Sequence, residues 1–163
     1  MRHRISVSPT KILASLAACA FLIWGLTGYS STTTDDGIVK VRSAYSFDET
    51  VAHLKADIDK KGIKFFLAVD QAALGADAGI SINRSTLLIF GNPPLGVQFL
   101  TSNPNAGLDW PVRLLVGEDD YGQVWTVYND FGWIARRHGI SNREAQFKMA
   151  SDVMASITSS VAK

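Results

Sequence analysis

The chain has 163 residues, and its 16 Lys and Arg side chains are nearly balanced by 15 Asp and Glu. The formal net charge of +1 at pH 7 leaves no basic footprint that could displace counterions from phosphates, which argues against nucleic-acid binding. Its single cysteine, Cys19, excludes an intramolecular disulfide and any thiolate metal site in the folded domain.

Residues 1–30 have the layout of an export segment. Basic residues in positions 1–11 precede the uncharged run ILASLAACAFLIWGL at positions 12–26. A basic region followed by an apolar region is typical of a secretory signal peptide. The run extends to about 18 residues with its neighbours, so an uncleaved membrane anchor is the alternative. Either way, we expect the rest of the chain in the periplasm or on the outer side of the cytoplasmic membrane, and we expect membrane contact only through this segment.

Two processing routes compete within the export segment. Small residues at Gly28 and Ser30 favour cleavage by signal peptidase before Ser31. The letters LAAC at positions 16–19 instead resemble a lipobox, in which Cys19 would be lipidated, although the residues after it are more apolar than a lipoprotein tether. Residues 31–37 are polar and rich in turn formers, so we predict a linker there and a single domain over residues 38–163.

Strands are predicted where apolar residues alternate with polar ones, or run without interruption between turn formers. The predicted strands cover residues 38–44, 63–69, 86–90, 112–118 and 124–128. Acidic residues and a glycine at positions 119–122 predict a tight turn between the last two. Two prolines stop the third strand at residues 93–94, and residues 95–111 are predicted to be irregular, with one helical turn.

Helices are predicted at both ends of the domain. Ser46 and Glu49 have the spacing of a capping box, and Gly62 is placed to end the first helix. A short helix is expected over residues 131–137, and a final helix is expected from Ser141, with Glu144 as its capping partner. Its buried stripe is predicted to consist of Ala145, Met149, Val153, Ile157 and Val161.

The predicted order is β-α-β-β-β-β-α. Strands that follow one another as hairpins, with helices at both ends, favour an antiparallel sheet covered on one face. We therefore predict an α+β two-layer sandwich, with a mostly antiparallel sheet of about five strands and its helices on one face.

Motifs of the common enzyme classes are missing from the sequence. It contains no Gly-x-Ser-x-Gly, no Walker-type loop and no Gly-x-Gly-x-x-Gly. The domain has two histidines, His53 and His138, which are far apart in sequence, so we expect no metal site and no cofactor.

A set of aromatic, amide and carboxylate residues remains near the ends of the predicted strands. Such a set could form a pocket with an aromatic floor and a polar mouth, although each residue could instead shape a turn or fill the core. The candidate ligand-binding residues are Asn92, Asp109, Trp125, Tyr128 and Asn129. An enzymatic alternative pairs His138 with Asp109 or Asp130 as acid and base.

Six short motifs occur in an order that resembles the domain-of-unknown-function 302 family. They are TLLIFGNP at 86–93, AGLDWPV at 106–112, ED at 118–119, VW at 124–125, YND at 128–130 and RHG at 137–139. The resemblance extends over about residues 38–162. It implies an α+β sandwich with a mostly antiparallel sheet, often as a dimer, but it implies no activity.

One position departs from the family pattern. Many members have Asp-His at the end of the second strand, where this chain has Asp70-Gln71. If that histidine serves a metal or a proton transfer elsewhere in the family, this chain lacks the group, and Asp70 is expected to be a turn residue.

Three functional hypotheses follow from these observations. The leading one is a non-enzymatic module that binds a small molecule or serves as an accessory domain. The others are an enzyme with an Asp/His pair and a structural homodimerisation domain.

Overall fold

The computed structural model describes residues 31–163. The expectations of a signal peptide, an anchor or lipidation at Cys19 all concern residues 1–30 and therefore lie outside the described part. Among residues 31–163, no helix combines the length and the apolar character that a membrane crossing requires.

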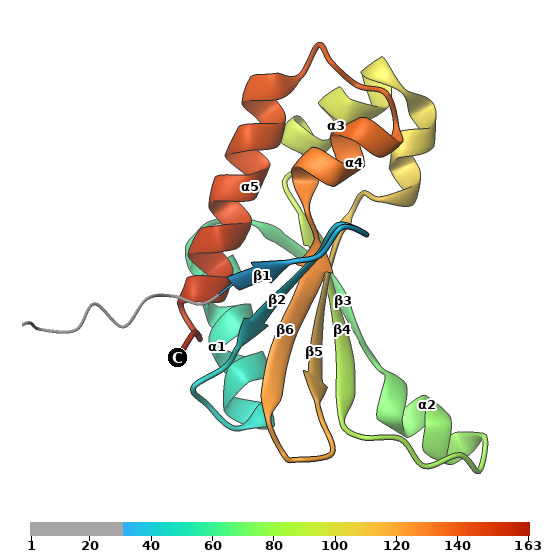
Figure 1. Ribbon diagram of the computed structural model, residues 1–163, viewed down its shortest axis with the longest axis vertical. Helices are drawn as coiled ribbons and strands as arrows, with labels where there is room; N and C mark the ends of the chain where they lie inside the picture. The colour runs from blue at the N-terminus through green and yellow to red at the C-terminus, as the bar shows by residue number, and fades with distance from the viewer. Residues whose placement is uncertain (1–30) are drawn as a thin grey trace, which may run out of the picture.

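Six antiparallel strands form one sheet in the order β1-β2-β6-β5-β4-β3 (Figure 1). The strands are β1 (Ser31–Thr33), β2 (Ile38–Arg42), β3 (Lys64–Asp70), β4 (Ser85–Gly91), β5 (Val112–Glu118) and β6 (Val124–Asn129). Since neighbouring strands are antiparallel, the end of β4, the beginning of β5 and the end of β6 lie at the same end of the sheet. The residues just outside these strand ends therefore gather there. Most of the candidate site residues lie at this end or next to it, whereas Trp125 lies near the opposite end, where it pairs with Gly117 of β5.

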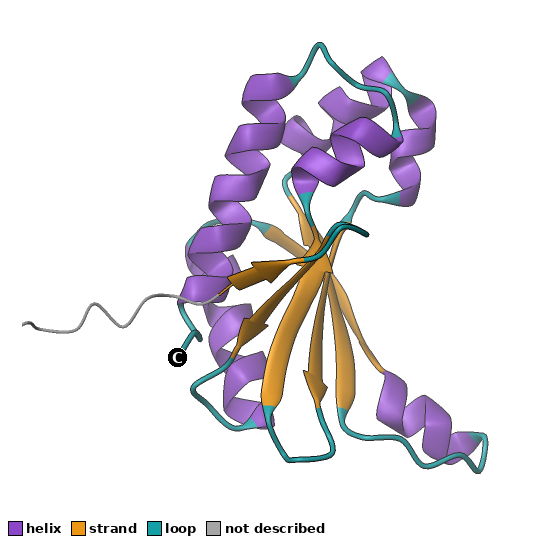
Figure 2. Cartoon of the chain, viewed as in Figure 1, coloured by secondary structure: helices purple, strands orange, loops and turns teal. Residues whose placement is uncertain are grey.

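Helices pack on one face of the sheet and around its two ends (Figure 2). They are α1 (Phe47–Lys60), α2 (Gln71–Asp77), α3 (Pro93–Ser102), the 3-10 helix η1 (Pro104–Leu108), α4 (Phe131–Arg137) and α5 (Glu144–Ser159). Helices α3, η1 and α4 cluster at the end of the sheet that carries the candidate residues, whereas α2 projects from the opposite end (Figure 1). The predicted α+β class with a mostly antiparallel sheet is confirmed.

The core lies between the sheet and helices α1 and α5. Its fully buried side chains come from alternate positions of the central strands and from one stripe of each helix. They include Leu54, Ile58, Leu88, Phe90, Leu114, Val116, Met154 and Ile157. The intervening strand residues Leu87, Leu115 and Val127 point to the other face and are only partly buried.

Local signals in the sequence correctly place several boundaries. The backbone N–H of Ser46 donates to Glu49 Oε2 at 3.1 Å, and the Ser46 hydroxyl donates to the same oxygen at 2.7 Å, so the expected box begins α1. Gly62 follows α1 with φ of +65°, a conformation that favours glycine. The turn at residues 119–122 joins β5 to β6, as predicted.

The segment predicted to be a linker, residues 31–37, instead begins the sheet. Ser31, Thr32 and Thr33 pair with β2, and a turn closed by the Gly37 N–H to the Thr34 carbonyl joins the two strands. β1 is exposed along its length. A polar composition therefore fits an edge strand as well as a linker, and the sheet gains a sixth strand.

Residues 95–111 were expected to be irregular but are largely helical. Pro93 and Pro94 end β4, as predicted, and they also occupy the first turn of α3. Proline is tolerated there because its missing N–H has no partner within a helix in any case. The same residues that stop a strand thus start a helix.

The final helix begins later than predicted, and its buried face agrees with the predicted stripe only in part. Arg143 is the N-cap of α5, and Ser141 and Glu144 form no capping box. The buried residues are Phe147, Ala150, Met154, Ile157 and Thr158. Of the predicted stripe, Ile157 and Val161 are buried as expected, whereas Val153 is partly buried, Ala145 is exposed and Met149 is 56% exposed. The helix thus has two adjacent apolar stripes that share Ile157, and packing buries Ala150 and Met154 rather than Met149.

Candidate functional site

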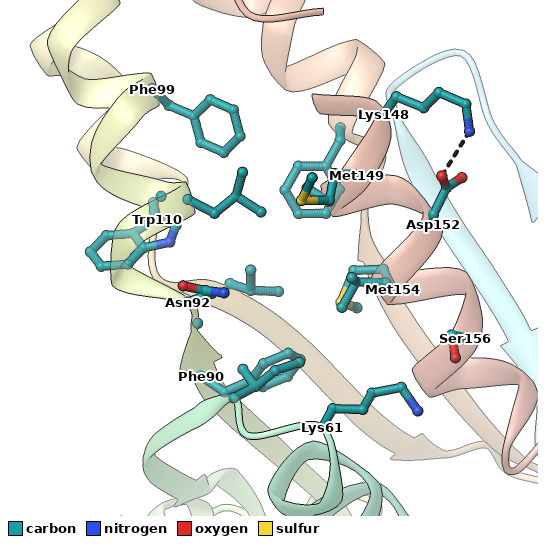
Figure 3. A pocket seen from close by; sticks show the side chains of 18 of the residues that line it. Lys61, Phe90, Asn92, Phe99, Trp110, Lys148, Met149, Asp152, Met154 and Ser156 are labelled. Atoms are coloured by element: carbon teal, nitrogen blue, oxygen red, sulfur yellow. Dashed lines mark hydrogen bonds and ion pairs between the residues drawn. The ribbon is translucent and has the colours of Figure 1, made fainter. Parts of the chain in front are cut away.

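A cavity of about 710 Å³ lies between α5, α3 and the end of the sheet (Figure 3). We call it the α5 cavity. Phe90 of β4, Phe99 of α3, and Met149 and Val153 of α5 are among the side chains that make its walls mainly apolar. Its volume lies within the range of drug-sized ligand sites, about 300–1,000 Å³.

Asn92 and Trp110 form one side of the α5 cavity and lie next to each other (Figure 3). Asn92 is the N-cap of α3, but its side chain makes no capping bond; its carbonyl accepts the N–H groups of Leu95 and Gly96 instead. The indole of Trp110 packs directly on α3, because a Cβ added at Gly96 would lie 1.8 Å from the indole Nε1. Only glycine at position 96 allows this approach.

Two lysines at the rim of the α5 cavity are paired with carboxylates one helical turn away. Lys61 Nζ lies 2.6 Å from Asp57 Oδ2, and Lys148 Nζ lies 2.7 Å from Asp152 Oδ2. Lys148 and Asp152 are both well exposed, and Figure 3 shows their ion pair along α5. The rim therefore has charged groups but little net charge.

The second group of candidate residues is a buried ion cluster around Asp109, which follows η1. The Asp109 side chain is 1% exposed, and its Oδ2 lies 2.6 Å from Nε2 of His138. The guanidinium groups of Arg113 and Arg137 donate to the same carboxylate at 3.0 and 3.1 Å. Since a carboxylate accepts hydrogen bonds, the His138 proton in this pair lies on Nε2.

A cavity of about 10 Å³ borders the Asp109 cluster and is separate from the α5 cavity. Tyr128 and Asn129 line it together with Asp109, while Val112 and Phe131 line both cavities. A space of this size holds about one water molecule. The charged residues of the Asp109 cluster therefore do not line the α5 cavity.

Two of the predicted site residues have local structural roles. Asp130 is the N-cap of α4, and its carboxylate accepts the backbone N–H of Trp133 at 2.7 Å. Trp125 lies away from the α5 cavity and donates from Nε1 to Asp119 at 2.9 Å. That indole N–H, together with the backbone N–H of Gln123, lowers the pKa of Asp119 below its ordinary value.

The structure thus divides the predicted set among separate places. Asn92 lines the α5 cavity, Asp109, Tyr128 and Asn129 lie at the small cavity, and Trp125 lies at neither. Asp70, expected to be a turn residue, caps α2 by accepting the Ala73 N–H at 3.0 Å. Within residues 31–163, no three His, Cys, Asp or Glu side chains come together as metal ligands.

Residues of α5 and α3 that line the α5 cavity were not among the predicted site residues. Met149 and Val153 were assigned to the core because they belong to an apolar stripe at helical spacing. The sequence does carry a signal for them, because α5 has a second apolar stripe with Phe147, Ala150 and Met154. A helix that packs on a sheet needs one apolar stripe for that contact, so the other stripe is available to line a cavity. Phe99 lies in a segment that was predicted to be irregular with one helical turn.

Comparisons with known proteins agree with this architecture. A solved structure described as uncharacterized conserved protein DUF302 from Bacillus stearothermophilus superposes with a TM-score of 0.70 at 13% sequence identity. The superposition covers 77% of this chain and 98% of that one. This similarity supports the fold.

Relatives of known name match over a shorter range. Fluoride-specific ion channel FluC 1 of Brucella suis biovar 1 and FluC 1 of Brucella abortus biovar 1 are each 38% identical over 106 residues. Those residues are 65% of this chain but 42% and 39% of the two relatives, so the chain spans about two fifths of their length.

The family comparison covers most of the chain. The model described as Domain of unknown function DUF302 matches residues 39–159, which run from β2 to the end of α5 and include both cavities. This chain belongs to the DUF302 family.

Proposed function

We propose that the domain binds an apolar small molecule in the α5 cavity and acts as a binding or accessory module rather than as an enzyme. The observation that supports this most directly is the cavity itself, about 710 Å³ with mainly apolar walls. Exposed Met149 is a second sign, because a flexible apolar side chain at the mouth of a cavity adapts readily to a ligand.

The groups at the α5 cavity are suited to holding a molecule rather than to transforming it. Its ionisable rim residues Lys61, Lys148 and Asp152 are engaged in ion pairs along their own helices. Neither Asp109 nor His138 lines the α5 cavity. A general acid or base has to come within hydrogen-bond reach of the reacting group, and a residue that does not line the α5 cavity is poorly placed to reach a ligand there.

A second candidate function, acid–base catalysis, is favoured by one distance. Asp109 Oδ2 and His138 Nε2 are 2.6 Å apart. A carboxylate at such a distance can orient a catalytic imidazole. However, the His138 side chain is only 5% exposed, and its Nε2 is already bound to Asp109. We therefore rank this function second; it requires a very small substrate that enters the cavity beside Asp109.

The accessory role draws support from the curated relatives. A stretch equivalent to 106 residues of this chain makes up about two fifths of proteins named as fluoride-specific ion channels. This arrangement fits a module that is combined with a membrane function in a longer protein.

We propose that the domain lies on the periplasmic side of the cytoplasmic membrane, because a basic region precedes an apolar one in residues 1–26. Intact mass of the membrane-fraction protein tests the fate of that segment.

The binding function is tested with the neutral apolar probe N-phenyl-1-naphthylamine and the purified full-length protein in detergent-free buffer. We expect its fluorescence to rise saturably on binding. Met149→Glu places a charge in the wall of the α5 cavity, so we expect it to weaken probe binding by at least about tenfold. Met149 is exposed, so this variant should keep its fold.

The matched control is Ala155→Glu, an exposed position of the same helix that does not line the α5 cavity. It adds the same charge and should leave probe binding unchanged. Absence of saturable binding, or equal binding by Met149→Glu and Ala155→Glu, contradicts the proposed function.

A further inference from the structure

The polar groups around the α5 cavity determine which head group a bound molecule can carry. Each of its two lysines has a carboxylate within 2.7 Å, so the rim carries little net positive charge. Of these carboxylates, Asp152 itself lines the cavity, so its negative charge faces any ligand as directly as the ammonium of Lys148 does. An anionic head group would have to compete with Asp57 or Asp152 for its partner.

The N-terminus of α3, where helices commonly bind anions, lacks the donors for that purpose. Pro93 and Pro94 have no backbone N–H, and the N–H groups of Leu95 and Gly96 are bound to the Asn92 carbonyl at 3.1 and 2.8 Å. Anion binding at a helix end depends on free N–H groups that point to the ligand. This end of the α5 cavity therefore does not stabilise a carboxylate or a phosphate.

The Asn92 side chain remains as a neutral polar group at the wall. Within residues 31–163, its amide makes no hydrogen bond, and it lies beside Trp110 at the cavity (Figure 3). An amide can donate to a ligand oxygen and can accept from a ligand hydroxyl. Asn92 is exposed at the edge of the cavity, and neither its neutral amide nor the paired lysines supply a net charge that would compensate a carboxylate or an ammonium group, while the cavity walls are mainly apolar.

We infer that the α5 cavity takes an uncharged amphiphile, a mostly apolar molecule with one hydroxyl or carbonyl oxygen that hydrogen-bonds to the Asn92 amide. This inference rests on the proposed function. Medium-chain alcohols and neutral esters belong to this chemical class, and the corresponding fatty acids and alkylammonium ions do not.

Displacement of N-phenyl-1-naphthylamine by three probes with the same ten-carbon chain tests the inference. The probes are 1-decanol, decanoate and decyltrimethylammonium, each added to the full-length protein at pH 8. We expect 1-decanol to displace the fluorophore at a concentration at least about tenfold lower than either ion. If decanoate or the ammonium probe competes as well as 1-decanol, the inference is wrong and the proposed function stands.

Two further outcomes separate the inference from the proposed function. If the fluorophore binds but 1-decanol fails to displace it, the inference is again wrong while the cavity remains a binding site. If the fluorophore does not bind at all, the proposed function falls, and the inference falls with it.

Variants identify the polar contact. Asn92→Leu keeps the side-chain size and removes the amide, so we expect 1-decanol to bind about three- to tenfold more weakly, while binding of the fluorophore is unchanged. Since Asn92 makes no capping bond through its side chain, α3 should persist in this variant, which circular dichroism checks. Lys148→Gln is expected to leave the affinity for decanoate unchanged. If Asn92→Leu binds 1-decanol as well as the native protein does, the Asn92 amide is not the polar contact. If Lys148→Gln binds decanoate markedly more weakly, the cavity does take an anionic head group, and the inference is wrong.

Discussion

The replacement Asp109→Ala is expected to destabilise the domain strongly, because it removes the acceptor at the centre of the buried cluster. His138 Nε2 would lose its partner at a site where the imidazole is 5% exposed. A buried donor left without a partner costs about 1–3 kcal/mol. Arg113 and Arg137 are 44% and 43% exposed and can turn to water, so their lost ion pairs add only about 0.5 kcal/mol each. The expected loss in the free energy of unfolding is therefore about 2–4 kcal/mol.

Urea denaturation followed by tryptophan fluorescence measures this loss, and a melting curve should show a decrease in Tm of about 10 °C. Asp152→Ala is the matched control, since it removes a carboxylate from the exposed pair with Lys148 and should cost less than about 0.5 kcal/mol. If Asp109→Ala is no more destabilising than Asp152→Ala, the cluster does not stabilise the fold in the way described.

Two other predictions concern positions away from the cavities. The lowered pKa of Asp119 means that its bonds to Trp125 and the backbone stabilise the fold above about pH 4, and that this contribution is lost as the pH falls below the ordinary pKa. The difference in urea midpoint between the native protein and Asp119→Asn should accordingly shrink from pH 7 to pH 3, and a constant difference would contradict this. Gly37→Ala should destabilise far more than Gly139→Ala: both glycines have positive φ, but only at Gly37 would the new Cβ meet another side chain, 2.2 Å from Trp133 Cγ. Equal losses in thermal melts would show that this contact relaxes freely.

Features set by neighbouring residues could be predicted from the sequence. The Ser46–Glu49 box, the glycine after α1 and the turn between β5 and β6 each depend on a few consecutive side chains. The order of these elements was enough to predict the α+β class. The motif residues also led to the correct family.

Features that depend on packing could not be predicted in the same way. Periodicity identified an apolar stripe on α5, but the sheet, which buries Met154 rather than Met149, decides which stripe enters the core. The α5 cavity arises only when α3 and α5 lie opposite each other, and no local pattern encodes its volume. Asp109 and His138 were proposed as a pair, yet their separation of 29 residues gives no information on whether the pair faces a ligand.

The two ends of the described domain meet on one strand. Ser31 of β1 pairs with Val41, and the backbone N–H of Lys163 donates to the carbonyl of the next residue, Arg42, at 3.2 Å. The chain therefore enters and leaves the domain at neighbouring points of β2. A domain with such adjacent ends can be inserted into a loop of another protein, or joined to it at either end, without stretching the host chain.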